Sequence, residues 1–345
     1  MKVSFTKILF TFLLLTLYAC NHHSPRHISR GFYYWKTNVN ISRYEQAVMD
    51  SVNAHTLYLH FFDVDITNSL GKPKPTAVIN FGNFIPQKQV VPVVFITPRA
   101  LDNMSWDLLD FYAKNIAQLI KNKAASIHLV PKEIQIDCDW SDHNRKRYFS
   151  LLKKLNRQPF FKDKTISATI RMYQVKYPKR AGIPPVDKGL LMVYNMGDIR
   201  NYYEQNSIIT TTTAKKYLQH VATYPLALDV ALPIYSWTLL FRKEKLKGIL
   251  RDVNKKDLQN HQIFKPKGDN RFLVRRDTVF KNYSLYAGEQ LRYEASNFNT
   301  VHSVANYLSS HLTSDSLRIL LYYCDSLNFT QFPSHEMEKI FCDFN

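Results

Sequence analysis

Glycine is scarce in this chain, with only 9 among its 345 residues, whereas aromatic residues make up 14% of them. Disordered and low-complexity segments have few aromatic residues, so this composition excludes those classes. Hydrophobic residues account for 45% of the chain. Such a length and composition suffice for one large hydrophobic core.

Cysteine is also rare, with four in the whole chain. Cys20 follows an N-terminal apolar segment and is treated with it below, which leaves Cys138, Cys324 and Cys342. An odd number of cysteines predicts no disulfide framework. Cys138 is expected to be a small buried hydrophobic residue, whereas Cys324 and Cys342 could form one late disulfide in an oxidising compartment.

No apolar run has the length that a membrane-spanning helix needs, which is about 20 residues. The run from Ile8 to Tyr18 has 11 residues, and Lys2 and Lys7 are the only charges before it. A charged start followed by a short apolar run is typical of a secretion signal. The sequence therefore predicts export rather than a membrane span.

The end of this run, LYAC at 17–20, resembles the lipobox of bacterial lipoproteins. The resemblance implies that residues 1–20 are a lipoprotein signal peptide and that Cys20 carries the lipid. Residues 21–30 then form a tether, and the protein is anchored to a membrane of the bacterial cell envelope, on its periplasmic or surface side. The alternative is an ordinary cleaved signal with an incidental cysteine.

Acidic side chains are few: 28 Asp and Glu stand against 46 Lys and Arg, which gives a formal net charge of +18. Such a charge could indicate nucleic acid, an anionic membrane surface or an acidic polymer as a partner. The basic residues are scattered, however, and no RNA- or DNA-binding motif is present. We therefore expect a solvated basic surface and no nucleic-acid partner.

The most regular feature of the sequence is an alternation of short β-branched or aromatic runs with longer amphipathic ones, the pattern of β/α units. Eight such runs predict an α/β fold of the TIM type, a (β/α)8 barrel over residues 31–345. The predicted strands are 31–37, 56–66, 90–97, 133–141, 165–174, 189–198, 226–237 and 316–325.

One long segment, at about 240–293 between the seventh and eighth predicted strands, interrupts this rhythm. It contains FLVRRDTVF (272–280) and YSLYAGEQLRYE (283–294), which alternate apolar and polar residues. This alternation predicts a small antiparallel insert. We expect the basic insert to form one wall over the barrel mouth.

The fourth predicted strand carries an unusual row of polar residues: Glu133, Gln135, Asp137, Asp139 and Ser141 alternate with apolar ones. Barrel strands alternate between an outer face covered by helices and an inner face. The acids are therefore predicted to point into the barrel. Those at its C-terminal end lie where barrel active sites are built.

Three motifs together resemble the family-18 glycoside hydrolases, the chitinases and endo-β-N-acetylglucosaminidases. IQIDCDWS resembles the Asp-x-x-Asp-x-Asp-x-Glu signature of that family, MVYN (192–195) its Met-x-Tyr-Asp, and LPIYSW (232–237) its Pro-x-Tyr. In that family the Glu is the general acid and its Asp neighbour orients the N-acetyl group that acts as the nucleophile. The resemblance thus implies a carbohydrate partner.

The departures from this signature concern its acids. Ile134 stands where the first Asp belongs, Ser141 replaces the catalytic Glu, and Asn195 replaces an Asp. A Ser hydroxyl is too weak an acid to protonate a leaving group near neutral pH. The family's standard mechanism is therefore not available. The chain is more similar still to a poorly characterised family of bacterial, often lipid-anchored barrel proteins of unknown function, which implies no activity.

Asp137 and Asp139 are the candidate catalytic residues, because two inward carboxylates two residues apart repel each other and split their pKa values. The alternative is a structural ion-pair network with Arg171. Arg171 could instead bind an anionic group of a substrate. Glu294, at the edge of the insert, is the only obvious acid that could swing over the mouth to replace the missing Glu.

The remaining candidate substrate-binding residues are Trp35, His60, Tyr194, Asn195, Tyr235 and Trp237. Four convergent aromatic residues near strand ends favour a carbohydrate groove, although each alone is more often part of a core. His60, with Asp63 and Asp65, has no familiar metal-site spacing, so a satisfied interior histidine is the simpler interpretation. We expect neither a metal nor a cofactor.

Two functions fit these residues: a divergent, membrane-anchored glycoside hydrolase that acts on an envelope or environmental polysaccharide, and a non-catalytic glycan-binding lipoprotein that has lost the general acid. A third hypothesis is a structural envelope protein whose interior acids only stabilise the barrel. A carboxyl group within reach of a bound glycosidic oxygen separates the first from the second. An open groove separates both from the third.

Overall fold

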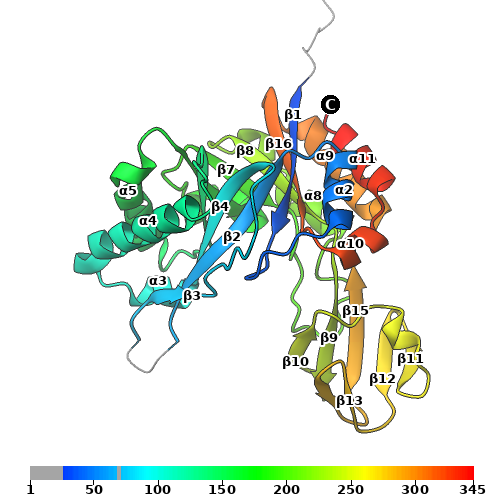
Figure 1. The fold of residues 1–345 in the computed structure, drawn as a ribbon. Coiled ribbons are helices and arrows are strands. Elements are labelled where there is room, and N and C mark those ends of the chain that lie inside the picture. The colour runs from blue at the N-terminus through cyan, green and yellow to red at the C-terminus, as the bar shows by residue number, and fades with distance from the viewer. Residues whose placement is uncertain (1–25, 68–70) are drawn as a thin grey trace, which may run out of the picture.

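The computed structural model describes residues 26–67 and 71–345, which form a closed barrel of eight parallel strands (Figure 1). The barrel confirms the predicted (β/α)8 fold. The chain pairs β1 with both β2 and β16, and this double pairing closes the ring. In order around the ring the strands are β1 (His27–Tyr34), β16 (Ser316–Tyr322), β8 (Leu228–Pro233), β7 (Lys188–Met192), β6 (Thr165–Arg171), β5 (Glu133–Cys138), β4 (Gln89–Ile96) and β2 (Thr56–Asp65).

Helices with one apolar face cover the outside of the barrel. In α5, Tyr148, Leu151, Leu152 and Leu155 recur at helical spacing and are all buried. The start of α2 is fixed by a capping box in which Ser42 and Glu45 bind each other's backbone amides. The principal helices are α2 (Arg43–Ser51), α3 (Pro98–Asn103), α4 (Leu109–Ala125), α5 (Arg145–Asn156), α8 (Thr211–Leu218), α9 (Phe298–His311), α10 (Ser326–Gln331) and α11 (Ser334–Cys342).

Two β/α units depart from the regular pattern. In the described residues no helix separates β2 from β4; the short strand β3 (Lys74–Thr76) pairs antiparallel with the end of β2 instead. Between β6 and β7 there are only two short helices, α6 (Met172–Lys176) and α7 (Pro178–Ala181). The eight parallel strands nevertheless pair around a closed ring.

The predicted start of the barrel and the predicted tether need correction. Residues 1–25, which include the predicted signal peptide and Cys20, lie outside the described residues. His27 to Arg30, predicted as part of the tether, already belong to β1, where they pair in register with Ser316 to Ile319 of β16. The barrel therefore begins before residue 31.

The insert is a five-stranded antiparallel sheet that leaves the barrel after β8 and returns at α9. It therefore lies at the C-terminal end of the barrel, away from the end at which β1 begins (Figure 1). It has its own core, which includes Leu250, Leu258, Phe264 and Leu291. Its strands are β9 (Ser236–Arg242), β10 (Lys245–Leu250), β11 (Phe264–Gly268), β12 (Arg271–Val274) and β15 (Gln290–Ala295), with the hairpin β13 (Thr278–Phe280) and β14 (Tyr283–Leu285) beside them.

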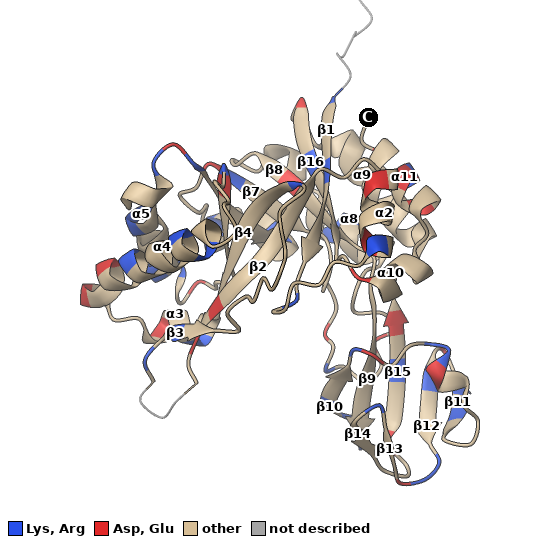
Figure 2. Ribbon diagram, in the orientation of Figure 1, with Lys and Arg blue, Asp and Glu red and all other residues tan. Residues whose placement is uncertain are grey.

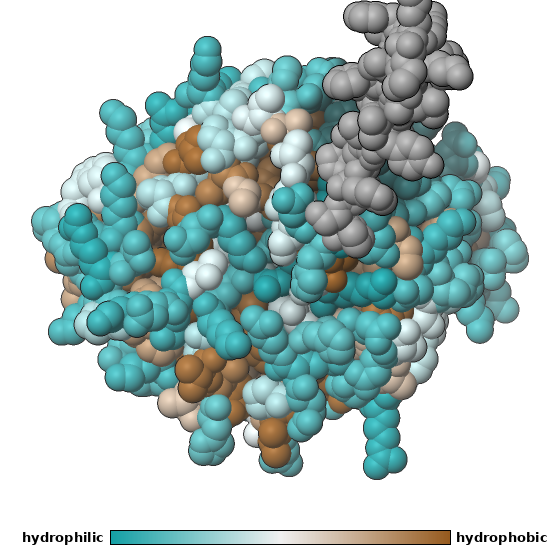
Figure 3. All heavy atoms as spheres, turned by 90° about the horizontal axis from the view of Figure 1, so that it is seen from above, coloured by the Kyte–Doolittle hydropathy of each residue, from teal (hydrophilic) through white to brown (hydrophobic). Residues whose placement is uncertain are grey.

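The N-terminal half of the barrel interior is filled by an ion network around Glu133, the first residue of β5. Its carboxylate accepts hydrogen bonds from Tyr58, Ser167 and Arg318, the last at 2.6 Å. Lys188 lies 3.2 Å from the same carboxylate. Because all charges in this layer are paired, it fills the barrel and leaves the polar residues at the other end to form a site. The face at this N-terminal end is largely hydrophilic, with smaller apolar patches (Figure 3).

The cysteines give a further correction. Cys138, Cys324 and Cys342 are all free, so the disulfide considered between Cys324 and Cys342 does not form. Cys138 is buried in β5, as predicted. Over residues 26–67 and 71–345, no helix has the length and apolar character that crossing a membrane requires.

Candidate functional site

A cavity of about 240 Å³ lies inside the C-terminal end of the barrel. All barrel strands except β8 supply lining residues to it, either from the C-terminal half of the strand or from the residues that follow the strand. Its wall combines aromatic rings with charged side chains. The lining residues are Tyr33, Trp35, Asp63, Phe95, Asp137, Asp139, Thr169, Arg171, Met192, Tyr194, Asn195 and Tyr322.

Asp137 lies on the inner face of β5 and is only 6% exposed. Its carboxylate accepts a hydrogen bond from the Thr169 hydroxyl on the neighbouring strand β6. Burial, reinforced by the nearby negative charge of Asp139, raises the pKa of Asp137 to about 7. Asp137 is therefore partly protonated at neutral pH and can act as a hydrogen-bond donor or an acid.

Asp139 follows β5 and lies closer to the opening of the cavity. The Nε of Arg171 donates to its carboxylate. The side chain of Asp139 is 33% exposed and that of Arg171 is 28% exposed. The ion pair considered from the sequence is thus present. Because both partners line the cavity and are partly exposed, the pair is also accessible to a ligand.

The position of the missing glutamate is outside the cavity wall. Ser141 lies beyond the end of β5 and is exposed, and its backbone amide donates to the side chain of Asn144. No carboxyl group is supplied from this position. The residue at this position is a serine, and it lies outside the cavity lining.

Neighbouring aromatic rings line one part of the cavity, and the rings of Trp35 and Tyr322 have centroids 6.2 Å apart. Trp35, which follows β1, packs against His60 with ring centroids 4.7 Å apart. Tyr194, which follows β7, is stacked on Tyr322 at 4.8 Å with an interplanar angle of 20°. Trp35 and Tyr322 are partly buried, so part of each ring remains accessible.

Asn195 lies three residues after the end of β7 and has a positive φ of 54°, a conformation that Asn adopts more readily than most residues. This turn directs its side-chain oxygen toward Tyr235, whose hydroxyl donates to it at 2.5 Å. Asn195 lines the cavity, while Tyr235 supports it from outside. Tyr235, predicted to bind substrate, thus contacts a lining residue and does not itself line the cavity.

His60 is a partnered interior histidine, the simpler of the two interpretations considered. Its Nε2 lies 2.6 Å from the Asp63 carboxylate, and the residue is 3% exposed. His60 does not line the cavity, but Asp63 does. In the described part of the chain, no three His, Cys, Asp or Glu side chains are arranged to hold a metal ion.

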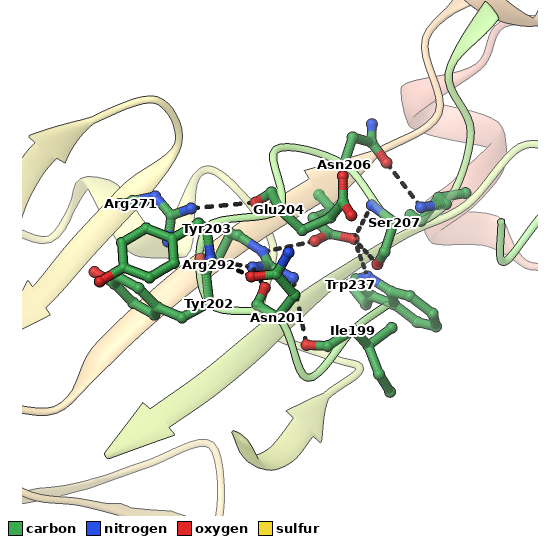
Figure 4. A network of polar contacts seen from close by, with 12 residues as sticks. Ile199, Asn201, Tyr202, Tyr203, Glu204, Asn206, Ser207, Trp237, Arg271 and Arg292 are labelled. Carbon is green, nitrogen blue, oxygen red and sulfur yellow. Dashed lines mark hydrogen bonds and ion pairs between the residues drawn. The ribbon is translucent and has the colours of Figure 1, made fainter. Parts of the chain in front are cut away.

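Glu294 cannot serve as the replacement acid, which corrects the prediction. Its carboxylate accepts hydrogen bonds from the Ser207 amide at 3.0 Å, the Trp237 indole at 2.9 Å and Arg292 Nε at 2.6 Å. Figure 4 labels these three donor residues. The side chains of Glu294 and Arg292 are both 0% exposed. The predicted binding residues Glu294 and Trp237 thus fasten the insert to the loop after β7 instead of facing the cavity.

Six lining residues were not among the predicted site residues: Tyr33, Asp63, Phe95, Thr169, Met192 and Tyr322. Each lies on a predicted strand and faces the inside of the barrel, so the same alternation that identified Asp137 contained the signal. Their residue types are common in barrel interiors, however, and apart from Met192 in MVYN no motif marks them.

Comparison with known proteins supports the fold. No protein-family model matches the sequence, and no curated protein matches it. Among solved structures, a family-18 chitinase, ChiB of Flavobacterium johnsoniae, is 13% identical with a TM-score of 0.54, and the match covers 92% of this chain and 94% of that one.

Two other solved structures are plant proteins. A mutant family-18 chitinase of Cycas revoluta, in complex with (GlcNAc)4, is 12% identical with a TM-score of 0.51, covering 92% of this chain and 99% of that one. A chitinase-like agglutinin of Robinia pseudoacacia is 12% identical with a TM-score of 0.52, and the match covers 90% of this chain and 99% of that one. The structural neighbours are thus family-18 chitinases and chitinase-like proteins.

Proposed function

We propose that the cavity at the barrel mouth binds a glycan. The observation that carries this proposal is the lining itself, in which the accessible rings of Trp35 and Tyr322 stand beside the charged groups of Asp139 and Arg171. Sugar rings present C–H groups that pack on aromatic faces and hydroxyls that bind carboxylate and guanidinium groups. This cavity offers both kinds of contact.

The size of the cavity limits how much of a glycan it holds. About 240 Å³ is below the ~300–1,000 Å³ that is usual for ligand pockets. Such a space suits one sugar residue, with the rest of the chain outside it. The insert beside the mouth is the available wall for those outer residues.

Binding without hydrolysis is the function that these residues favour. Glycosidases of the common classes need two carboxyl groups on opposite sides of the bond to be broken, separated by about 5–9.5 Å. Here position 141 is a serine, Glu294 is buried in an ion pair, and Asp139 is paired with Arg171. The chitinase-like agglutinin provides an example of this fold in a protein described by its binding.

Hydrolysis is a second candidate because of Asp137. A pKa of about 7 is suited to a general acid at neutral pH. Release of reducing ends from chitotetraose by the wild type, abolished in Asp137→Asn, would establish it. If neither protein releases reducing ends over a long incubation, the hydrolase candidate is excluded and glycan binding remains.

We predict that Trp35→Ala weakens glycan binding at least tenfold, about 1.4 kcal/mol, because the ring supplies an accessible apolar face of the cavity. Binding of the wild type and variant to an array of immobilised glycans, followed by calorimetry with chitotetraose, measures the effect. Trp106→Ala is the matched control, since Trp106 is 52% exposed and does not line the cavity. Equal binding by all three proteins would contradict the proposal.

We also propose that the protein is anchored to the bacterial envelope through Cys20. The lipobox-like LYAC supports the anchor. The position of the described chain fits it as well, because β1 begins at the end of the barrel opposite the cavity (Figure 1). An anchor there leaves the cavity facing away from the membrane.

Cys20→Ser is expected to release the protein from membrane pellets, because the thiol that would carry the lipid is removed. Fractionation by centrifugation followed by immunoblotting checks this. Cys342→Ser, which changes an exposed cysteine elsewhere, should still sediment with membranes. If Cys20→Ser sediments as fully as the wild type, there is no lipid at this residue.

A further inference from the structure

The insert is strongly basic. Residues 240–293 contain 14 Lys and Arg but only 6 Asp and Glu. Three of these cations are neutralised by close ion pairs, namely Arg242 with Glu289, Lys281 with Asp257 and Arg292 with Glu294. Most of the others are exposed. Figure 2 marks the Lys and Arg positions on the strands and turns of the insert in blue.

Arg251 directly follows β10, at the end of that strand that lies next to the junction between the insert and the barrel. Leu250, the last residue of β10, pairs with Thr238 of β9, which places Arg251 beside Trp237 where β9 joins the barrel. Arg251 is exposed, and its guanidinium forms no ion pair or side-chain hydrogen bond with the described residues. It is therefore a free cation at the base of the insert.

The surroundings of Arg251 include the aromatic residues of the mouth. Burial raises the pKa values of Tyr235, Tyr322 and Tyr323, and the positive charge of Arg251 acts against this shift in each case. Tyr322 lines the cavity. Trp237, beside which the pairing of β9 with β10 places Arg251, packs on Tyr235 with ring centroids 5.5 Å apart, and Tyr235 packs on Tyr322 at the same distance. Arg251 therefore lies on the side of the mouth formed by β8, β16 and the insert.

The opposite side of the mouth has the opposite charge. Asp63 of β2, Asp137 of β5 and Asp139 just after β5 all line the cavity, and Arg171 is the one basic side chain among the lining residues. An anionic group would be repelled from this side and attracted to the insert. The charge asymmetry therefore gives a bound anionic glycan one preferred orientation.

We propose that Arg251 binds a carboxylate or phosphate group of an acidic glycan, one sugar residue of which occupies the cavity. The inference rests on the proposed glycan-binding function and specifies its ligand class. A guanidinium can hold either group through two parallel hydrogen bonds, which a single lysine cannot do. The other free cations of the insert would attract the remaining charges of the same polymer.

Calorimetry with matched ligands tests the inference. The probes are a hyaluronan tetrasaccharide and its carboxyl-reduced derivative, which differ only in charge. A second pair, phosphorylated and unphosphorylated chitotetraose, distinguishes phosphate from carboxylate. We expect the wild type to bind at least one charged probe tenfold or more tightly than its neutral counterpart at low salt, with a preference that shrinks as salt is added.

Arg251→Gln should lose this preference while keeping its affinity for the neutral probes. Arg276→Gln is the matched control: Arg276 is also exposed, but it follows β12 at the end of the insert away from the barrel, and the preference should survive. If Arg251→Gln retains the preference, or if the wild type has none while still binding a neutral probe in a Trp35-dependent manner, the inference is wrong and the proposed function stands. If the wild type binds none of the probes and no arrayed glycan, both the inference about Arg251 and the proposed glycan-binding function are wrong.

Discussion

Glu294→Ala is expected to lower the free energy of unfolding by about 3–5 kcal/mol, because it leaves the fully buried Arg292 without its carboxylate partner. The same change removes the acceptor of the Ser207 amide and of the Trp237 indole. Burial already lowers the pKa of Arg292, and the charge of Glu294 acts against that shift. Urea unfolding followed by tryptophan fluorescence measures the loss.

The control for this variant is Glu244→Ala. Glu244 is exposed on the insert and accepts one hydrogen bond from the Tyr203 hydroxyl at 3.0 Å. Its loss should change the free energy of unfolding by less than about 0.5 kcal/mol. Equal unfolding curves for Glu294→Ala and the wild type would mean that the Arg292–Glu294 pair does not fasten the insert.

The second large effect is a loss of stability as pH rises from about 4 to 8, caused by Asp137. Its pKa is about 7 in the folded chain against an ordinary value of about 3.9 when unfolded. Between these values the folded chain holds a proton that the unfolded chain has released, so raising the pH favours unfolding. Three pKa units correspond to about 4 kcal/mol, present below about pH 4 and lost once the pH passes about 7.

Asp137→Asn should remove this dependence, since the amide does not titrate and can still accept from Thr169. We therefore expect the variant to be more stable than the wild type at pH 8, by an amount that shrinks towards pH 4. Asp142→Asn, which changes an exposed acid, is the control and should follow the wild type. A difference between Asp137→Asn and the wild type that is constant across this range would contradict the raised pKa.

Much of the fold could be predicted from the sequence because barrel strands carry a strong period-two signal. The ends of the strands do not follow from this signal. The predicted runs 165–174 and 189–198 extend past Arg171 and Met192, where β6 and β7 end. Hydrophobic residues continue there, but α6 begins immediately after Arg171, and Asn195 turns the chain with a positive φ.

The site was predictable where it depended on one strand and not where it depended on contacts between distant segments. Asp137, Asp139 and Arg171 lie on neighbouring strands, so their inward direction followed from alternation alone. The burial of Glu294 depends on Ser207, 87 residues away in the chain, and no local pattern contains that contact. Glu294 stands at the edge of a basic insert in the sequence, and only its partners in the fold show that its carboxylate is buried.

The position of a bound glycan is the most direct test of the central claim, that the barrel mouth is a glycan site. The measurement is a crystal structure of the protein with the glycan that it binds most tightly on the array. We predict a sugar ring inside the cavity, against Trp35 or Tyr322 and within hydrogen-bond distance of the Asp139–Arg171 pair. A glycan bound elsewhere, for example on the exposed rings of Trp106 and Phe111, with the cavity free of sugar, would contradict the claim.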